Sequence, residues 1–382
     1  MNYPRPSGSL ISYMSDKVKA GGGLNLAQGL PGFPPPPELL DTLRTITGEP
    51  FHQYAPGIGD AELLDATHAL FTPHGPGRDQ FLITNGATEA ITLIYTYLAK
   101  LLPRGFTTLA FEPVYESYRN LPPIFGSRFV AFDAPEGILP RRADLRKVIM
   151  AEGVKVVFVC SPGNPWGRIW RRNEVEAILE LSEELDFTVI FDSVYHGIYF
   201  GEAPYLPVER ISPRLFFVDS YSKMLSITGW RVGFLAADRS HFAALKSMHD
   251  YTSLSSSSVL QKAIARYLAA HDNGAAYLAA ARRTVGTSFA ALEKPLGSLG
   301  FRIPPIDGGY FIWAELPERF DDGLAFAEEL YAQEKLAVVP GIHFSDAGGR
   351  FVRFNVAKPL DDITEAARRI EKFVRTGRLS GG

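Results

Sequence analysis

The sequence predicts an α/β fold, in which a large domain with a mostly parallel sheet is flanked by helices on both faces and joined to a smaller α+β domain. Between about Gln80 and Ala236, short apolar runs alternate with helical patterns, as they do in βαβ units. Several of these runs are apolar at successive positions, which is typical of strands buried on both faces. At 382 residues the chain is long enough for two domains.

Seven apolar runs are the expected strands of the large domain. In chain order they are QFLIT, TTLAF, RFVAF, VKVVFVC, FTVIF, RLFFVD and VGFLAA. Between them, apolar residues recur at helical spacing over 87–102, 142–152 and 173–185. We therefore expect a large domain over residues 40–275.

The smaller domain is expected to combine residues 276–382 with the N-terminal segment 1–39. A helical stretch from about 257 to 291 precedes it, and its own elements are the strand-like GYFIWAEL, a helix over 323–335, the strand-like LAVVP and RFVRFNVA, and a final helix over 364–375. The glycine- and proline-rich segment 21–37 does not form a pattern of its own. We expect it to pack across the site or against the small domain.

Charge and cysteine content exclude several classes of function. The formal net charge of −3 gives no sign of a nucleic-acid or acidic-membrane partner. The single cysteine, Cys160, rules out an intrachain disulfide and a cysteine-based zinc cluster, and no metal is expected. The N-terminus lacks the apolar core of a signal peptide, and no apolar run approaches the roughly 20 residues that cross a bilayer. A cytoplasmic, soluble protein is the expectation.

The segment SYSKMLSITGWRVGF carries the most specific chemical pattern in the chain. It places Ser220, Ser222, Lys223 and Arg231 directly after the run LFFVD. A lysine amine condenses with an aldehyde to form a Schiff base, while hydroxyls and a guanidinium can hold a phosphate. Pyridoxal 5'-phosphate carries both groups. Because a single lysine is ordinarily a solvated surface residue, this interpretation depends on what the other strand ends provide.

Groups that a pyridine–phosphate cofactor needs also follow the other expected strands. They are Gly86, Ala87 and Thr88 after QFLIT, Tyr115 after TTLAF, Asn164 after VKVVFVC, and Asp192 and Tyr195 after FTVIF. Each one alone has an ordinary explanation as a turn residue, a helix cap or a core aromatic. Ligands of doubly wound sheets bind at the carboxyl ends of the strands, so the set together indicates a cofactor site.

The chemistry requires these residue types. A carboxylate such as Asp192 keeps the pyridine nitrogen protonated, so that the ring can accept electrons. Tyr195 and Asn164 can hydrogen-bond the ring oxygen, the Tyr115 ring can stack on the cofactor, and the helix N-terminus at Ala87 and Thr88 offers N–H groups to the phosphate. Lys223, once free, can move a proton at the substrate Cα.

A handle for the substrate carboxylate is expected at Arg353, in the run GRFVRFNVA. Its neighbours Val352 and Phe354 are apolar, and an arginine in a largely buried strand needs an anionic partner that its fork can bind. The alternatives are that Arg353 faces solvent on an edge strand, or that Arg350 takes the role.

From LNLAQGLPGF to RFVRFNVA, the chain resembles the class I/II aminotransferases of pyridoxal-phosphate fold type I. The resemblance implies that Lys223 is the Schiff-base lysine and, with Asp192 and Tyr195, forms the catalytic group. It also implies the binding residues: Ser220, Ser222, Arg231 and the backbone at Gly86, Ala87 and Thr88 for the phosphate, Tyr115, Asn164 and Tyr195 for the ring, and Arg353, Asn164 and the Gly29 backbone for the substrate carboxylate.

The resemblance extends to a partner and shows two departures. QYAPGIGDAEL is similar to the family segment whose tyrosine reaches the phosphate of the neighbouring subunit, which implies a homodimer and this role for Tyr54. The chain departs from the family at Trp166 in NPWG, where Thr or Ser is usual, and at Ser193, where an acidic residue usually follows the catalytic aspartate.

The leading functional hypothesis is amino transfer from an L-amino acid to a 2-oxo acid by a two-stage ping-pong mechanism. The same fold also supports elimination, as in C–S β-lyases, decarboxylation and ring closure, but the GWRVG pattern favours transamination. An effector-binding module fused to a helix-turn-helix is disfavoured, because the roughly 40 residues expected before the sheet region lack helical periodicity.

The substrate is expected to be hydrophobic, aromatic or methionine-like. No second cation for a dicarboxylate can be placed from the sequence, and the expected rim residues are mostly apolar or aromatic. These are Tyr13, Leu30, Tyr54, Trp166 and Tyr251.

Overall fold

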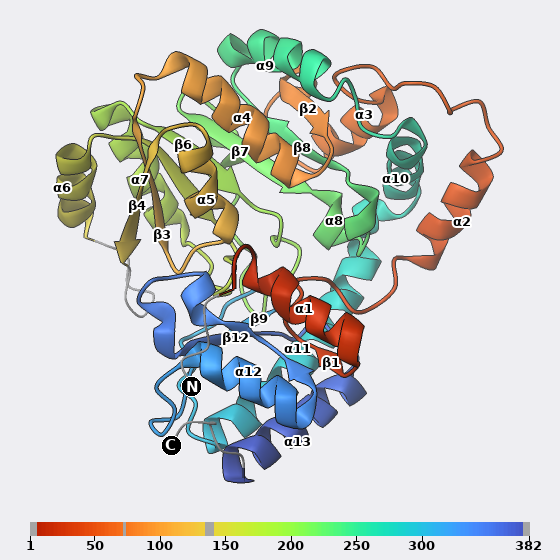
Figure 1. Cartoon of the computed structure of the whole chain (residues 1–382). Coiled ribbons are helices and arrows are strands. Elements are labelled where there is room, and N and C mark those ends of the chain that lie inside the picture. Colours follow the sequence, from red (N-terminus) through yellow and green to blue (C-terminus); the bar gives the residue numbers. More distant parts are fainter. Residues whose placement is uncertain (1–5, 72–73, 134–140, 377–382) are drawn as a thin grey trace.

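The computed structural model describes residues 6–71, 74–133 and 141–376 and has two lobes (Figure 1). The larger lobe contains a seven-stranded sheet, and the smaller lobe contains a three-stranded sheet with helices beside it. The expected fold class is therefore confirmed. The proposed domain limits, 40–275 against 1–39 with 276–382, stay a prediction.

All seven apolar runs form strands of the large sheet. Its spatial order is β2 (Phe81–Thr84), β8 (Gly233–Ala236), β7 (Leu215–Ser220), β6 (Thr188–Asp192), β5 (Val154–Cys160), β3 (Thr107–Glu112) and β4 (Arg128–Asp133). The five strands from β7 to β4 are parallel, and β8 runs antiparallel to both β7 and β2. Parallel strands end at one edge, so their following loops gather there.

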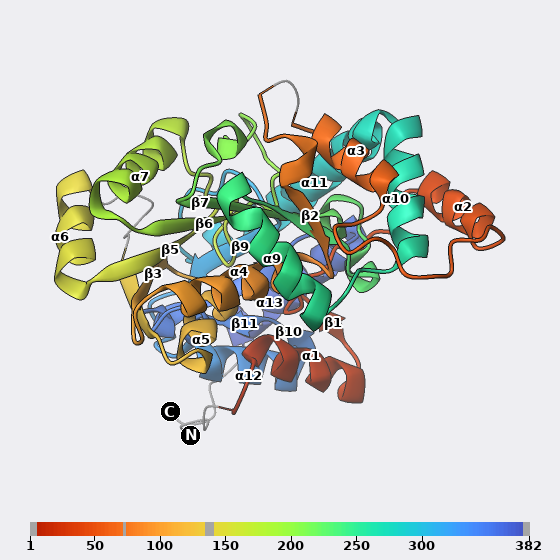
Figure 2. The same ribbon diagram turned by 90° about the horizontal axis from the view of Figure 1, so that it is seen from above.

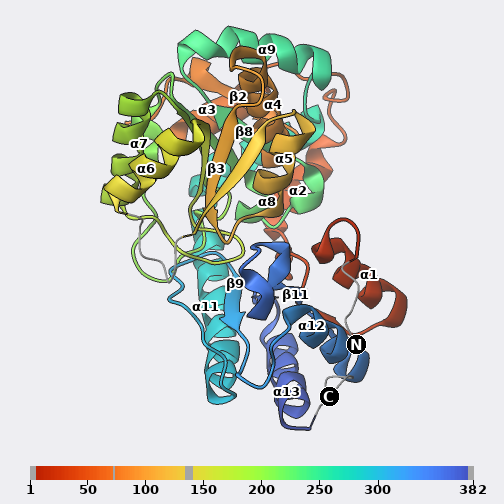
Figure 3. The same ribbon diagram turned by 60° about the vertical axis from the view of Figure 1, so that its left-hand side comes forward.

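Helices cover both faces of this sheet, as Figures 2 and 3 show. One face packs against α4 (Ala87–Leu101), α5 (Glu116–Ile124) and α9 (Arg239–Thr252). The other packs against α3 (Ala61–Ala69), α6 (Arg142–Glu152), α7 (Arg172–Leu185) and α10 (Ser258–Ala270), and α2 (Pro37–Ile46) lies on α10. Along β5, Phe158 belongs to the first core and Val157 and Val159 to the second. This alternation explains why the run is apolar at successive positions.

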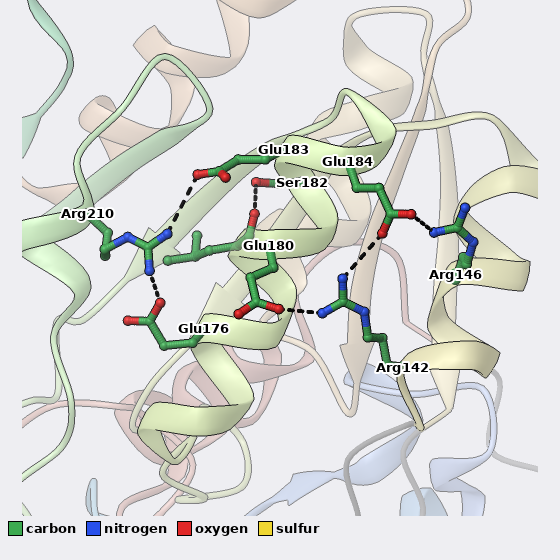
Figure 4. Close-up of polar contacts among 9 residues, drawn as sticks. Arg142, Arg146, Glu176, Glu180, Ser182, Glu183, Glu184 and Arg210 are labelled. Carbon is green, nitrogen blue, oxygen red and sulfur yellow. Dashed lines mark hydrogen bonds and ion pairs between the residues drawn. The ribbon is translucent and has the colours of Figure 1, made fainter.

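Ion pairs join the outer side of α7 to its neighbours (Figure 4). The Arg142 guanidinium on α6 reaches Glu180 at 2.5 Å and Glu184 at 3.3 Å. Arg146 also pairs with Glu184, and Arg210 pairs with Glu176 and Glu183 in the same way. These side chains are partly to largely exposed, so each pair contributes about 0–1 kcal/mol, and burial of the apolar side of α7 holds the helix in place.

The smaller lobe also contains its expected elements. Its sheet runs in the order β11 (Val339–Pro340), β12 (Phe351–Asn355) and β9 (Phe311–Glu315), with α11 (Ala275–Ser298), α12 (Gly323–Glu334) and α13 (Leu360–Thr376) beside it. One expectation was wrong: the stretch 257–291 is two helices. It breaks between α10 and α11 because Asn273 and Gly274 adopt positive φ angles of 54° and 77°.

The N-terminal segment differs more from its prediction. It was expected to lack helical periodicity, yet α1 (Leu10–Gly21) buries Leu10 and Met14, one helical turn apart, against the core of the smaller lobe. The expectation of about 40 residues before the sheet region was also wrong, because α1, α2 and α3 all precede β2, which begins at Phe81. As expected, the segment after α1 packs against the small lobe: β1 (Leu24–Asn25) pairs with β10 (Leu336–Ala337).

Within residues 6–71, 74–133 and 141–376, no helix combines the length and the apolar character needed to span a membrane.

Candidate active site

The loops after the parallel strands, together with parts of the smaller lobe, enclose a cavity of about 390 Å³. Twelve of the residues predicted from the sequence line it: Gly29, Ala87, Thr88, Tyr115, Asn164, Asp192, Tyr195, Ser220, Ser222, Lys223, Arg231 and Arg353. The structure thus brings together side chains from five strand ends and from β12. Gly86 lies directly behind this lining, and Tyr54 lies outside it, with its side chain 84% exposed.

Lys223 is held at the cavity by the short helix α8 (Tyr221–Met224), which starts as β7 ends. The Ser220 hydroxyl caps this helix by accepting a hydrogen bond from the Ser222 N–H at 3.0 Å. The Lys223 ammonium donates to the Gly29 carbonyl at 2.8 Å. Burial lowers the pKa of Lys223 to about 8, and the positive charges of Arg353 and Arg231 act in the same direction. A larger fraction of this amine is therefore neutral near pH 7 than for an ordinary lysine.

Asp192 lies buried at the end of β6 with two hydrogen-bond donors. The Tyr118 hydroxyl donates to Oδ2 at 2.6 Å, and the Val194 N–H donates to Oδ1 at 3.1 Å. Burial raises the pKa of Asp192 to about 6, although both hydrogen bonds act to lower it. A positive group brought beside this carboxylate, such as a protonated ring nitrogen, would favour its ionised form.

Tyr118 is a site residue that the sequence reasoning missed. It is 3% exposed, lines the cavity, and stacks its ring on Phe158 with the centroids 4.6 Å apart. The signal was present in the run YESY, because Tyr118 lies three residues after Tyr115, close to one helical turn, at the start of α5.

The residues expected at the phosphate form a cradle at the N-terminus of the fifteen-residue helix α4. Gly86 has a φ of 82°, and a Cβ there would lie 2.8 Å from the Arg231 Nη2. That guanidinium donates to the carbonyls of Asn85 and Thr228, both at 3.2 Å. The buried Ser222 hydroxyl has no hydrogen-bond partner in the part of the chain that the structure describes. Free helix N–H groups, an arginine and an unpartnered hydroxyl fit a phosphate at this position.

Arg353 is fully buried on β12, the middle strand of the small sheet, so the solvent-facing alternative is wrong. Its Nη1 donates to the Asn164 side-chain oxygen at 2.8 Å, and its Nη2 donates to the Ala27 carbonyl. The guanidinium carbon lies 4.3 Å from the Phe311 ring centroid. Burial lowers its pKa to about 10, which still leaves it protonated near pH 7.

The competing Arg350 lies elsewhere. It donates to the Leu316 carbonyl at 3.0 Å and does not line the cavity. The Nε atoms of Arg350 and Arg353 are both buried without a hydrogen-bond partner among the described residues, but only Arg353 lines the cavity. Arg353 therefore keeps donor capacity for an anion inside the cavity.

The expected rim residues are only partly beside the cavity. Leu30 lines it, whereas Trp166 is buried in the loop after β5 and its indole N–H donates to the Pro305 carbonyl at 2.8 Å. Tyr251 is 90% exposed. Ser193, the other departure from the family pattern, is buried and donates its hydroxyl to the Val218 carbonyl at 3.2 Å. The two departures therefore sit behind the cavity and do not line it.

Comparisons with known proteins agree with this geometry. A family model described as aminotransferase class I and II matches residues 22–370. A probable N-succinyldiaminopimelate aminotransferase of Mycobacterium tuberculosis is 30% identical over 95% of both chains. An aspartate aminotransferase of Thermotoga maritima is 26% identical over 92% of both. The solved structure of N-succinyldiaminopimelate aminotransferase from M. tuberculosis superposes with a TM-score of 0.87 at 28% identity, covering 95% of this chain and 97% of that one. This chain therefore belongs to the class I and II aminotransferases and is a pyridoxal-phosphate-dependent enzyme.

Proposed function

We propose that this aminotransferase moves the amino group of a hydrophobic, aromatic or methionine-like L-amino acid to a 2-oxo acid in two half-reactions. The observation that carries the proposal is the convergence of Lys223, Asp192 and Arg353 on one cavity whose other walls are largely apolar. A nucleophilic amine, a buried carboxylate and a carboxylate-binding guanidinium are the groups that amino transfer requires.

Cofactor binding is assigned to the strand-end residues. When bound, pyridoxal phosphate supplies an electron sink for the bonds at the substrate Cα. The phosphate would be held by Arg231, by the Ser222 hydroxyl and by the α4 N–H groups of Ala87 and Thr88. The Ser220 hydroxyl would also hold it, once it no longer donates to the Val232 carbonyl. The ring would be held by Asp192 at its nitrogen, Asn164 and Tyr195 at its oxygen, and Tyr115 against its face.

Arg353 is assigned to substrate binding, and Lys223 is assigned to proton transfer at the substrate Cα. The Arg353 guanidinium binds the α-carboxylate and so fixes which substituent of Cα faces Lys223. The Lys223 amine, made less basic by burial, would accept the proton from Cα and deliver it to the cofactor carbon within the first half-reaction. The second half-reaction would run the same proton transfer in reverse on the 2-oxo acid. Tyr195 lines the cavity and packs against Tyr310 and Phe311, and its hydroxyl would hydrogen-bond the ring oxygen.

The substrate class is inferred from the other cavity walls. Ile11, Leu30, Ile91 and Val194 contribute apolar surface, which favours a hydrophobic or aromatic side chain. The cationic residues lining the cavity, within the described residues, are Lys223, Arg231 and Arg353, and each already has a role. The two relatives above are named for acidic substrates, but at 26–30% identity the shared chemistry leaves side-chain pockets free to differ.

We also propose that two copies of the chain form a homodimer. Within each copy, we propose that the large domain spans residues 40–275. Tyr54 projects its ring into solvent, 84% exposed, at a position that fits contact with a second copy. Tyrosine is among the residues enriched in protein–protein interfaces. In the dimer, Tyr54 would complete the phosphate site of the neighbouring subunit.

The visible absorption spectrum of the purified holoenzyme tests the proposal. Single amino acids are added without any oxo acid, at saturating concentration. Conversion of the cofactor to its pyridoxamine form by phenylalanine, leucine or methionine, faster than by aspartate, is the expected result. Release of ammonia in place of that conversion would replace amino transfer by elimination, as in a C–S β-lyase. Equal or faster conversion by aspartate would overturn the substrate class.

A further inference from the structure

Glu116, a residue to which the proposed function gives no role, lines the same cavity as Arg353. It is the first residue of α5 and directly follows Tyr115. Unlike Asp192, the other carboxylate in this lining, Glu116 has no role toward the cofactor. Its presence requires an explanation, because a buried or half-buried carboxylate is costly unless it is paired.

Two contacts from other parts of the fold fix the Glu116 carboxylate. The Ser9 hydroxyl, at the start of α1, donates to Oε1 at 3.1 Å, and the His343 Nε2, in the smaller lobe, lies 2.9 Å from Oε2. Burial alone would raise the pKa of Glu116, but the contact with His343 and the hydrogen bond with Ser9 lower it below its usual value. Glu116 is therefore a fixed negative charge near pH 7.

Glu116 and Arg353 are near enough to interact electrostatically, and each shifts the pKa of the other. Within the described residues they form no direct ion pair, since the Arg353 donors go to Asn164 and Ala27. A substrate bound through its α-carboxylate at Arg353 would therefore place its side chain in the field of an anion that Arg353 does not neutralise by contact.

Resting on the proposed function, we infer that Glu116 is a specificity-determining residue, which excludes substrates with a second carboxylate and leaves uncharged side chains unaffected. Like charges across a partly desolvated cavity repel strongly. The cations that line the cavity, Lys223, Arg231 and Arg353, are each assigned to the cofactor or to the substrate α-carboxylate. Rejection through an unpaired like charge is a common route to specificity.

The competing explanation is that Glu116 only ties Ser9 and His343 together across the lobes. Substitution of Glu116 would then weaken the binding of every ligand to the same extent. His343→Asn separates the two explanations, because it removes the link to the smaller lobe while it keeps the Glu116 charge.

The test compares two unreactive ligands on the holoenzyme by isothermal titration calorimetry, maleate as the dicarboxylate and 3-phenylpropionate as the monocarboxylate. The variants are Glu116→Gln, Glu116→Asp and His343→Asn. Glu112→Gln is the matched control, because Glu112 also bridges to the smaller lobe, through Ser345, but lies outside this cavity.

The expected result is that Glu116→Gln improves maleate binding relative to 3-phenylpropionate on the order of tenfold, the effect of removing one like-charge repulsion. Glu116→Asp, His343→Asn and Glu112→Gln should leave the ratio within about twofold of wild type. An unchanged ratio in Glu116→Gln overturns the role of Glu116. Tighter binding of maleate by the wild type would instead overturn the proposed substrate class, while the ratio in Glu116→Gln still decides the role of Glu116.

Discussion

The Tyr118 hydroxyl donates a hydrogen bond of 2.6 Å to the Asp192 carboxylate, and both side chains are buried beside the cavity. Tyr118 belongs to the helix that follows β3, and Asp192 ends β6, so the bond joins two separate strand–loop units. It partly offsets the burial that raises the pKa of Asp192. The ionised form of Asp192, which is proposed to pair with the cofactor ring nitrogen, therefore depends on a tyrosine outside the residues assigned to the cofactor.

Tyr118→Phe should weaken cofactor binding about tenfold. A hydrogen bond to a charged group contributes about 1.5–3 kcal/mol, and rearrangement of the groups around Asp192 recovers part of that free energy. Without this hydrogen bond, the pKa of Asp192 rises further and the carboxylate pairs less well with the ring nitrogen. The dissociation constant of pyridoxal phosphate, measured by absorption titration, checks this. Tyr95→Phe is the control, since Tyr95 is also buried but bonds Thr108, away from the cavity. Equal effects of the two substitutions would contradict a specific role for Tyr118.

The apoenzyme should capture pyridoxal phosphate faster as the pH rises through about 8. Burial depresses the pKa of Lys223 to that value, and only the neutral amine is nucleophilic. The capture rate should therefore fall below about pH 8, where the Lys223 amine is protonated. With an ordinary lysine, the midpoint of this change in rate would lie about two pH units higher. Stopped-flow absorbance across this range measures it. A midpoint near pH 10 would show that the amine is not desolvated in solution.

Lys223→Ala should lose nearly all turnover and retain cofactor only loosely. The substitution removes both the amine that attaches the cofactor and the base that moves the Cα proton. Lys223→Arg keeps a positive charge without a usable nucleophile, so it should be equally inactive. Turnover with saturating amino and oxo acid gives the answer, and a variant that kept a tenth of wild-type activity would refute the assignment.

Arg353→Ala should raise the KM for amino and oxo acids by roughly a hundredfold, the order of magnitude of a bidentate charge-assisted pair. The cofactor spectrum should stay unchanged, because Arg353 contacts Asn164 and Ala27 and is assigned to the substrate. Arg350→Ala is the matched control on the neighbouring turn and should leave KM as it is. A shifted cofactor spectrum in Arg353→Ala would indicate a structural role.

Tyr54→Phe should weaken cofactor binding by about tenfold, the value of one hydrogen bond to a charged group, and leave the molecular mass in solution unchanged at that of a dimer. Sedimentation velocity gives the mass and absorption titration gives the affinity. Tyr251→Phe, a second highly exposed tyrosine, controls for general surface effects. A monomer with full cofactor affinity would refute the role of Tyr54.

The large domain could be predicted from the sequence because its signals are local. A run such as VKVVFVC is apolar at successive positions since both faces of β5 are covered, and the predicted helices 87–102 and 142–152 lie within a residue of those found. The polar residues after each strand could be grouped because parallel strands end at a common edge. The assignment of Arg353 to a buried strand succeeded for the same reason: its neighbours are apolar.

Other features depended on contacts between distant segments. The helix α1 was missed although Leu10 and Met14 stand one helical turn apart. Their burial comes from the smaller lobe, whose strands β10 and β11 lie more than 300 residues away in the chain. The position of Tyr118 could have been read from its spacing to Tyr115, but the roles of Tyr118 and Glu116 come from Asp192, Ser9 and His343, far away in sequence. No periodicity or spacing carries such pairings.

The connection between β7 and β8 has a further consequence. Its ends are paired, Ser220 opposite Gly233, so Lys223 and Arg231 lie on one loop that is closed at its base. The Ser220 hydroxyl donates to the Val232 carbonyl at 3.1 Å within that closure. The pairing of β7 with β8 therefore fixes the distance between the backbone positions of Lys223 and Arg231, the two residues that would hold the cofactor. Cofactor binding should therefore cost little conformational entropy in this loop. A shift of register between β7 and β8 would displace Lys223 and Arg231 together.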